Sequence, residues 1–189
     1  MVRWMPDSRG RLVEAAQALY SERGFEETTV AAIATRAGLT ERTFFRYFAD
    51  KREVLFWGSN VLQKLLVGAV DDAPAGAAPL DAIAAAFEAA ATAIFRDRRE
   101  YSRQRQAIIA ADVALQEREL SKLATLAAAL TDALRRRGLG DPAASLAAEA
   151  GVVIFKIAVA RWVEEDEQRD LPYLIHDSLA TFRAVTARN

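Results

Sequence analysis

The side chains that most often carry catalysis or bind metals are scarce in this sequence. There is no cysteine, and His176 is the only histidine. Tyr173 lies three residues before His176 and Ala180 four residues after it, so neither a Glu-x-x-His iron motif nor a His-Glu-x-x-His zinc motif is formed. A Gly-x-Ser-x-Gly motif and a phosphate-binding loop are also missing. The sequence therefore predicts no enzyme, no metal site and no cofactor, and it places His176 at a surface or an interface.

Basic side chains gather between residues 36 and 52, although the whole chain carries a formal net charge of only −1. They outnumber the two acidic residues of this segment, Glu41 and Asp50. The basic residues are Arg36, Arg42, Arg46, Lys51 and Arg52. A local basic surface on a nearly neutral protein favours site-specific binding of double-stranded DNA over general coating of nucleic acid.

Two short helices joined by a tight turn are predicted around these basic residues. The first helix is expected from Val30 to Ala37, and the second from Glu41 to Tyr47. Gly38-Leu39-Thr40 would form the turn between them. Such a pair is a helix-turn-helix unit, whose second helix can lie in the major groove of DNA.

The second of these helices divides into two faces. Phe44 and Phe48 lie four residues apart and are expected in the core. Arg42, Phe45 and Arg46 fall on another face, which we expect to meet the DNA. An arginine can bind guanine through two hydrogen bonds, so Arg42 and Arg46 are the expected base or phosphate contacts. Arginines that are merely solvated are the alternative.

Four hydroxyl groups and one ammonium group are expected to touch phosphates. Thr29 and Thr40 would cap the two helices, and a cap can also contact a phosphate. Thr43 and Tyr47 can donate hydroxyl hydrogen bonds, with half-buried packing as the alternative for Tyr47. Lys51 lies at the start of the next predicted helix, where free backbone amides already attract phosphate.

The whole chain is expected to be all-α, with about nine helices. Strong helix formers dominate the composition, and all five prolines fall between periodic segments. The predicted helices cover residues 8–23, 30–37, 41–47, 50–70, 79–96, 98–111, 114–137, 142–166 and 171–187. Apolar residues make up 52% of the chain and charged residues 27%. This balance indicates a globular protein, and neither a signal peptide nor a membrane span is expected.

A longer stretch of sequence around the predicted helix-turn-helix resembles a known family. Residues 24–34, Gly-Phe-Glu-Glu-Thr-Thr-Val-Ala-Ala-Ile-Ala, and residues 37–55, from Ala37 to Leu55, are similar to the DNA-binding domain of TetR-family regulators. The resemblance covers about residues 8–56, with the helix-turn-helix motif at 29–48. An N-terminal three-helix DNA-binding domain is therefore expected over residues 8–56.

The resemblance also implies roles for individual residues. In this family the positions of Thr43, Tyr47 and Lys51 commonly contact phosphate. The position of Phe45 is very often a tyrosine, and phenylalanine lacks the hydroxyl that would bind a phosphate. Contact between the Phe45 ring and a thymine methyl group is the alternative at that position.

Residues 57–189 are expected to form a second domain for effector binding and dimerisation, as the same resemblance implies. The last two long helices would form a four-helix bundle with those of a second copy. The apolar residues of the first of these helices are Val152, Val153, Phe155, Ile157, Val159 and Trp162, and those of the second are Leu174, Ile175, Leu179 and Phe182. The expected interface residues are Val152, Phe155, Leu174, Leu179 and Phe182. A monomer that buries all these side chains internally is the alternative.

An effector pocket is expected inside the second domain. Segments 98–106 and 115–120 resemble the C-terminal domain of regulators related to the mycofactocin regulator, a subgroup associated with acyl-CoA-like ligands. That resemblance implies an apolar tunnel for an acyl chain, with Arg99, Arg103 or Arg105 at the phosphates. The expected lining residues are Phe87, Ile94, Tyr101, Arg103, Ile108, Leu126, Phe155, Val159 and Trp162. Plain core packing is the alternative for the apolar residues, and a solvated helix face for the arginines.

These features together predict a cytoplasmic homodimer that binds a pseudo-palindromic DNA operator. The protein would repress transcription until an apolar small molecule releases it, and the resemblance to the mycofactocin-regulator subgroup implies an acyl-CoA-like one. An activator, an enzyme and a dimeric scaffold that has lost DNA binding are the competing classes. The basic face of the helix at 41–47 argues against the scaffold, and no membrane partner is expected.

Overall fold

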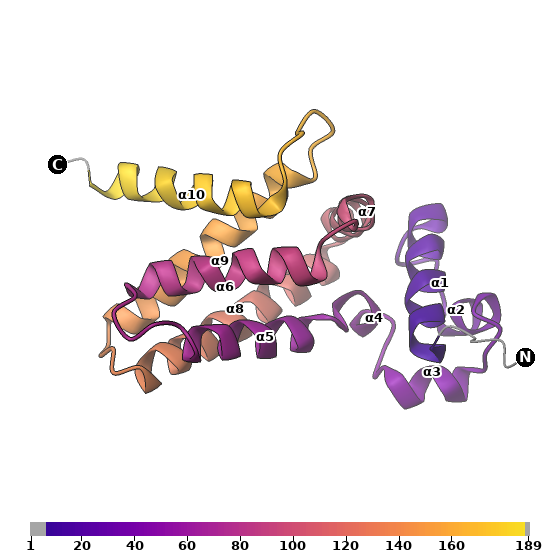
Figure 1. Cartoon of the computed structure of the whole chain (residues 1–189). Coiled ribbons are helices and arrows are strands. Elements are labelled where there is room, and N and C mark those ends of the chain that lie inside the picture. The colour runs from indigo at the N-terminus through magenta and orange to yellow at the C-terminus, as the bar shows by residue number, and fades with distance from the viewer. Residues whose placement is uncertain (1–6, 188–189) are drawn as a thin grey trace, which may run out of the picture. The chain divides into compact units, whose positions relative to one another are not determined.

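The computed structural model describes residues 7–187, and every regular element among them is helical (Figure 1). The helices are α1 Ser8–Arg23, α2 Val30–Arg36, α3 Glu41–Tyr47, α4 Glu53–Phe56, α5 Ser59–Asp71, α6 Pro79–Ile94, α7 Arg99–Ala110, α8 Val113–Arg136, α9 Ala143–Trp162 and α10 Leu171–Thr186. The all-α prediction is confirmed, and most predicted helix ends lie within two residues of the observed ones.

The chain folds into two compact units, and neither unit is one continuous stretch of sequence. Unit 1 runs to Gly58 and also contains Gln104–Leu120. Unit 2 contains Ser59–Arg103 and the chain from Ser121 onward. Helices α7 and α8 contribute residues to both units, because the unit boundaries fall inside these helices. The sequence-based division placed one boundary between residues 56 and 57. It did not assign the segment Gln104–Leu120 to the first unit.

Helix α1 supplies the centre of unit 1. Leu12, Ala16 and Leu19 repeat at helical spacing and are buried. The helix ends at Gly24, whose φ of 83° lies in the left-handed region that favours glycine. Helix α1 packs against α2, α3 and α4, so it fixes the short helices that follow it.

The single helix predicted over residues 50–70 is wrong, because the chain is divided into α4 and α5 around Trp57 and Gly58. Glycine inside a helix costs about 0.5–1 kcal/mol relative to alanine. The Nε of Arg105 also donates a hydrogen bond of 3.0 Å to the carbonyl oxygen of Leu55. In an uninterrupted helix that oxygen would accept the backbone N–H of Ser59. Helix α4 is therefore a separate short element, held by another segment of unit 1.

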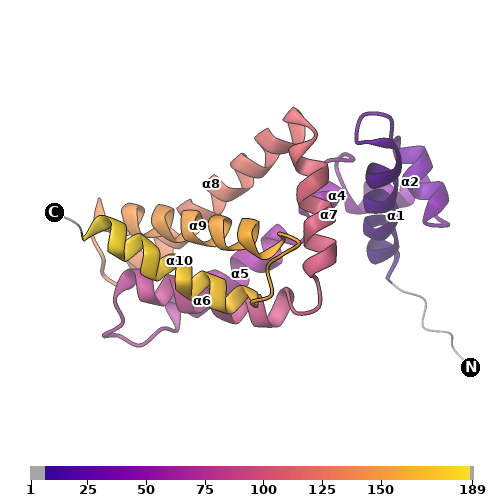
Figure 2. The same cartoon turned by 90° about the horizontal axis from the view of Figure 1, so that it is seen from above.

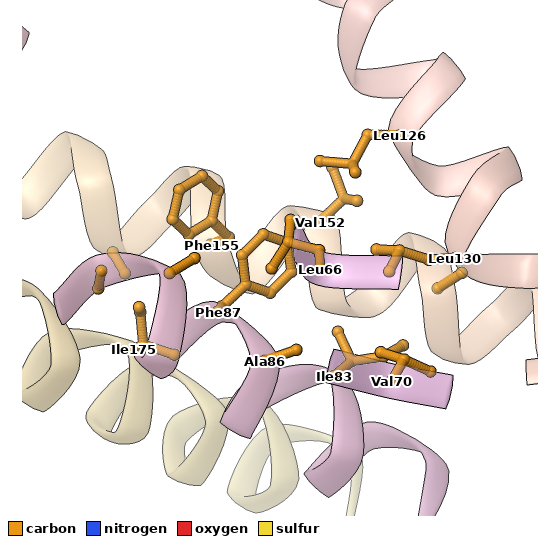
Figure 3. Close-up of a cluster of buried hydrophobic side chains, with 14 of the residues drawn as sticks. Leu66, Val70, Ile83, Ala86, Phe87, Leu126, Leu130, Val152, Phe155 and Ile175 are labelled. Carbon is orange, nitrogen blue, oxygen red and sulfur yellow. The ribbon is translucent and has the colours of Figure 1, made fainter. Parts of the chain in front are cut away.

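Side chains from α5, α6, α8, α9 and α10 meet in the core of unit 2 (Figure 3). Phe87 of α6 and Phe155 of α9 are stacked, with ring centroids 4.3 Å apart and planes inclined by 13°. Helices α6 and α9 approach closely at Gly151, where an added Cβ would clash with Ile83. Each fully buried large apolar side chain in such a core stabilises the fold by about 1.5–3 kcal/mol.

By length and composition, α9 could cross a membrane, with a mean hydropathy of 1.8 over its most apolar window. It is the one helix among residues 7–187 that passes this test. In the structure α9 packs along α10 and against α6 (Figure 2). Its Phe155, Val159 and Trp162 belong to the buried core of unit 2. We therefore interpret α9 as the core helix of a globular unit.

Candidate DNA-binding surface and effector core

Helix α3 is anchored to unit 1 by its apolar face. Phe44 is fully buried and Phe48 is 5% exposed, as the sequence predicted. Their rings lie 5.4 Å apart between centroids. The helix begins at Thr40, whose hydroxyl accepts the backbone N–H of Thr43 at 3.2 Å. The tight turn before α3 contains Gly38 with a φ of 65°, which again favours glycine.

The opposite face of α3 is exposed and carries the predicted contact residues. Arg42 and Arg46 are both exposed, and Phe45 is 56% exposed while its ring meets Phe44 edge-on. The Arg42 side chain forms no ion pair or hydrogen bond with any other residue between 7 and 187. A free guanidinium keeps all its donors for bases or phosphates. The geometry therefore agrees with the outward orientation expected from the sequence.

The threonines of the motif are engaged as helix caps. The hydroxyl of Thr29 accepts the backbone N–H of Ala32 at 3.1 Å and so starts α2. The hydroxyls of Thr40 and Thr43 lie 3.0 Å apart and share a hydrogen bond at the start of α3. Thr29 and Thr40 are exposed, so a phosphate can reach the same hydroxyls that cap the helices.

Lys51, for which the sequence suggested a phosphate contact, is held by backbone oxygens of unit 1, and the phosphate contact stays a prediction. Its Nζ donates to the backbone oxygens of Phe25 at 2.8 Å, Glu26 at 3.1 Å and Thr28 at 3.0 Å. The ammonium group also lies 4.3 Å from the centre of the Phe25 ring. An ammonium group has three N–H donors, and all three have partners here. Lys51 therefore ties the start of α4 to the loop between α1 and α2.

Burial of the Tyr20 ring reinforces this tie. The hydroxyl of Tyr20 donates a hydrogen bond of 2.6 Å to the carbonyl oxygen of Lys51. Burial, together with the nearby carboxylate of Asp50, raises the pKa of Tyr20 well above its usual range. Burial also favours the neutral form of Asp50, but hydrogen bonds from the Arg52 side chain and from the Glu53 and Arg52 backbone outweigh it and lower the pKa of Asp50. The segment from Asp50 to Glu53 is thus well fixed in unit 1.

Residues of α7 and α8 surround α4 inside unit 1. The Nε of Arg118 donates to Glu53 at 2.5 Å, and this hydrogen bond raises the pKa of Arg118. Arg105 pairs with Glu119 at 3.1 Å, in addition to its hydrogen bond to Leu55. Its guanidinium also lies 5.1 Å from the centre of the Phe56 ring. These contacts were not predicted, because they join segments far apart in the sequence.

Five of the expected pocket residues come together in unit 2, and the others do not. Phe87, Leu126, Phe155, Val159 and Trp162 share one buried cluster. Half-buried Phe95 extends it, with its ring centroid 5.9 Å from that of Phe155 and 6.2 Å from that of Trp162. Ile94 and Tyr101 are half-buried, and Ile108 belongs to unit 1. The structure thus places an aromatic core where the sequence suggested a pocket wall.

The three arginines suggested for ligand phosphates all have partners within the chain. Arg99 donates to the backbone oxygens of Trp162 at 2.7 Å and Arg169 at 2.9 Å. Arg103 forms ion pairs with Glu100 at 2.6 Å and Glu165 at 2.7 Å. Arg105 is held against α4, as described above. Arg103 lies on a solvated face, the alternative weighed from the sequence, since its side chain is 41% exposed, whereas that of Arg105 is 24% exposed.

Four of the five expected interface residues are core residues of a single chain. Val152, Phe155, Leu174 and Leu179 are each less than 8% exposed, so they offer almost no surface to a partner. Phe182 alone is partly exposed. Other apolar side chains of α9 and α10 lie on the surface instead. These are Leu146, Val153, Ile157, Tyr173 and Val185.

The single histidine lies where the sequence placed it. His176 is exposed on α10, and its Nδ1 lies 3.8 Å from a carboxylate oxygen of Glu88. Among residues 7–187, no group of three or more histidine, cysteine or acidic side chains is arranged to hold a metal ion.

Comparison with known proteins agrees with both parts of the chain. Residues 12–56 match the family described as bacterial regulatory proteins, tetR family. Residues 77–187, more than half of the chain, match the MftR C-terminal domain. The transcriptional regulator TcmR of Streptomyces glaucescens is 38% identical over 82 residues, which cover 43% of this chain and 36% of TcmR. The chain therefore aligns with about a third of the length of that relative.

Two solved structures share the fold over nearly the whole chain. FadR of Thermus thermophilus, a TetR-family repressor solved with lauroyl-CoA, is 22% identical, covers 96% of both chains and gives a TM-score of 0.55. SmeT of Stenotrophomonas maltophilia, solved with triclosan, is 22% identical over 92% of this chain and 90% of SmeT, with a TM-score of 0.65. The helix-turn-helix with its outward arginines, the helical second unit and both family matches lead to one conclusion: this chain belongs to the TetR family of bacterial transcriptional regulators and carries an MftR-type C-terminal domain.

Proposed function

We propose that this regulator is a cytoplasmic repressor that binds a pseudo-palindromic operator as a homodimer and leaves it when a small apolar ligand binds. The observation that carries the proposal is the outward face of α3, with Arg42, Phe45 and Arg46 exposed and Phe44 buried on the other side. A helix held in this way can enter the major groove and present its arginines to base edges. The dimer brings two such helices to successive half-sites.

An exposed apolar stripe on α9 supports the dimer. Leu146, Val153 and Ile157 are 67%, 47% and 49% exposed and recur at intervals of seven and four residues, which places them on one face. Exposed Tyr173 and Val185 add apolar surface on α10, which packs along α9 (Figure 2). Apolar side chains arranged in this way favour a helical partner face. A second copy of the same two helices completes a four-helix bundle.

The ligand is proposed to be apolar and acyl-CoA-like. The aromatic cluster around Phe87, Phe155 and Trp162 in unit 2 is the chemical surface that an acyl chain would contact. The MftR-type C-terminal domain and the lauroyl-CoA bound by the Thermus FadR point to the same ligand class. Because Arg99, Arg103 and Arg105 are all engaged within the chain, phosphates of such a ligand must displace existing partners or use other donors.

Ligand binding is proposed to act on DNA through α4. Arg118 and Arg105 hold this short helix from α8 and α7, and both of these helices continue into unit 2. A ligand in unit 2 that favours another arrangement of α7 and α8 would therefore change how α4 is held. Only a ligand that binds the two arrangements with different affinity can shift their populations.

Selection of duplexes from a random pool by the purified protein tests the proposal. We expect enrichment of an inverted repeat whose half-site centres lie about 34–36 Å apart or at a related spacing. Titration with lauroyl-CoA should then release the selected duplex, and sedimentation should give a dimer. Failure to enrich any repeat would contradict the operator, whereas enrichment without release by lauroyl-CoA or shorter acyl-CoA compounds would contradict only the ligand class.

A further inference from the structure

Four side chains of unit 1 alternate between arginine and aromatic residue beside α3. The Nη2 of Arg46 donates to the Tyr47 hydroxyl at 3.0 Å, and its guanidinium lies 4.8 Å from the centre of the Tyr47 ring. The guanidinium of Arg9, from α1, lies 5.1 Å from the same ring and 5.6 Å from the ring of Trp57. Arg46, Tyr47, Arg9 and Trp57 thus form one row, which we name the stacked row.

No carboxylate of the described residues neutralises the two guanidiniums of the stacked row. Neither Arg9 nor Arg46 forms an ion pair with a carboxylate among residues 7–187. Other arginines of unit 1 do: Arg36 pairs with Glu22 at 2.6 Å, and Arg52 pairs with Asp50 at 2.8 Å. Arg9 in the first turn of α1 and Arg46 on α3 therefore keep their positive charge for another molecule.

Stacking on aromatic rings orients a guanidinium without using its donors. A cation over a ring is attracted by the ring quadrupole, and the N–H groups at the edge of the guanidinium plane stay free for an anion. Two like charges close to one ring also repel each other, and anions that contact them relieve that repulsion. Phosphate oxygens match this geometry because a guanidinium can bind them in a bidentate manner.

We propose that Arg9 and Arg46 form a phosphate clamp that holds the DNA backbone next to the recognition helix, with Tyr47 and Trp57 as positioning residues. This proposal rests on the proposed function, since the phosphates are those of bound duplex DNA. It changes the role of Tyr47, whose ring centre lies 4.8 Å from the Arg46 guanidinium and 5.1 Å from that of Arg9, while its hydroxyl already accepts from Arg46. It also adds Arg9 and Trp57, which the sequence pattern did not single out.

Salt dependence of DNA binding distinguishes a phosphate contact from a base contact. Loss of one phosphate contact lowers the slope of log K against log salt by about 0.9 for duplex DNA. Over the tenfold range between 1 M and 0.1 M salt this corresponds to a loss of about eight-fold in affinity at 0.1 M. The loss should be the same for operator and random duplexes, because the backbone carries no sequence information.

Arg9→Ala tests the clamp in the full-length protein by fluorescence anisotropy on operator and random duplexes at several KCl concentrations. We expect a slope lower by about one and equal losses on both duplexes. Arg23→Ala is the matched control, because Arg23 is an exposed arginine in the last turn of the same helix. It should leave slope and affinity unchanged. An unchanged slope for Arg9→Ala would overturn the clamp.

Two variants of Trp57 test positioning without removing a charge. Trp57→Ala should weaken binding less than Arg9→Ala, and Trp57→Phe, which keeps a ring for Arg9 to stack on, should restore most of the affinity. Wild-type affinity in Trp57→Ala would remove Trp57 from the proposal, provided that thermal melting shows an intact fold.

If the wild-type protein binds no duplex at all, the proposed function fails. If Arg42→Ala loses operator affinity while Arg9→Ala binds like wild type, only the clamp fails.

Discussion

The basic side chains of α3 and those around α4 differ in what they touch. Arg42 of α3 has no partner among residues 7–187, and Arg46 contacts only its neighbour Tyr47. Around α4, by contrast, Lys51 donates to three backbone oxygens, and Arg105 and Arg118 form ion pairs with glutamates. The cations near α4 hold the protein together, whereas those of α3 are free to bind another molecule.

This difference shows that a cluster of basic residues in the sequence is not yet a binding surface. Of the five basic residues between 36 and 52, Arg36, Lys51 and Arg52 are occupied by the chain itself. A carbonyl or carboxylate that holds a cation must give it up before a phosphate can take its place, and a buried acceptor left unpaired costs about 1–3 kcal/mol. Replacing occupied and free cations should therefore affect different properties of the protein.

The largest effect on stability is expected from Lys51→Met. The substitution keeps the length of the side chain but removes three hydrogen bonds to the loop between α1 and α2, and we expect a loss of about 2–3 kcal/mol in the free energy of unfolding. Urea unfolding measures this loss. Lys64→Met, at an exposed lysine of α5, is the control. If Lys51→Met is instead as stable as the wild type and its salt slope for DNA binding falls by about one, Lys51 contacts a phosphate.

Arg42→Ala should do the opposite, with a large effect on DNA binding and almost none on stability. We expect operator affinity to fall by about 1–3 kcal/mol, or roughly 5- to 150-fold, with little change on random duplex. Arg42→Lys should not recover the lost affinity if the contact is bidentate. Anisotropy titrations on both duplexes give the comparison, and equal losses on the two would remove Arg42 as a base contact.

Arg105→Ala should weaken the hold on α4 by about 1–2 kcal/mol, because a half-buried, charge-assisted hydrogen bond to Leu55 and an ion pair with Glu119 are lost together. The affinity for lauroyl-CoA, measured by calorimetry, should not fall, because a weaker hold on α4 does not disfavour the ligand-bound arrangement. Arg118→Ala removes the neighbouring ion pair with Glu53, so it should also weaken the hold on α4 without lowering the affinity for lauroyl-CoA. A loss of lauroyl-CoA affinity confined to Arg105→Ala would show that this arginine binds ligand phosphate after all.

The sequence predicted well where the signals are local. The bounds of α1 and α3 match the prediction at both ends, because Thr40 caps α3 and Gly24 ends α1 through contacts made within a few residues. The burial of Phe44 and the exposure of Arg42 follow from the same short-range periodicity. An amphipathic helix can turn only one face to its core, so the outward face was predictable without knowledge of the rest of the fold.

The features that the sequence did not predict depend on contacts across the chain. Arg105 reaches the carbonyl of Leu55 from 50 residues away, and this contact accompanies the break between α4 and α5. The dimer-interface residues of α9 were also hard to predict, because this helix carries apolar residues on several sides. Spacing alone could not tell buried Val152 from exposed Val153. The buried side of α9 contains Gly151, which packs so closely against Ile83 of α6 that an added Cβ would clash.

The smallest expected effect concerns Phe45, the exposed aromatic residue that lies between Arg42 and Arg46 in the sequence of α3. Phe45→Tyr adds a hydroxyl at the far end of a ring that already rests edge-on against Phe44. A phosphate within reach would gain one hydrogen bond, worth about 1 kcal/mol, and binding to operator and random duplex would tighten about five-fold. If the ring contacts a thymine methyl group instead, burial of the hydroxyl should weaken operator binding alone. Phe45→Leu, which keeps an apolar side chain without a hydroxyl, separates these outcomes, because it weakens the operator complex only if apolar contact matters.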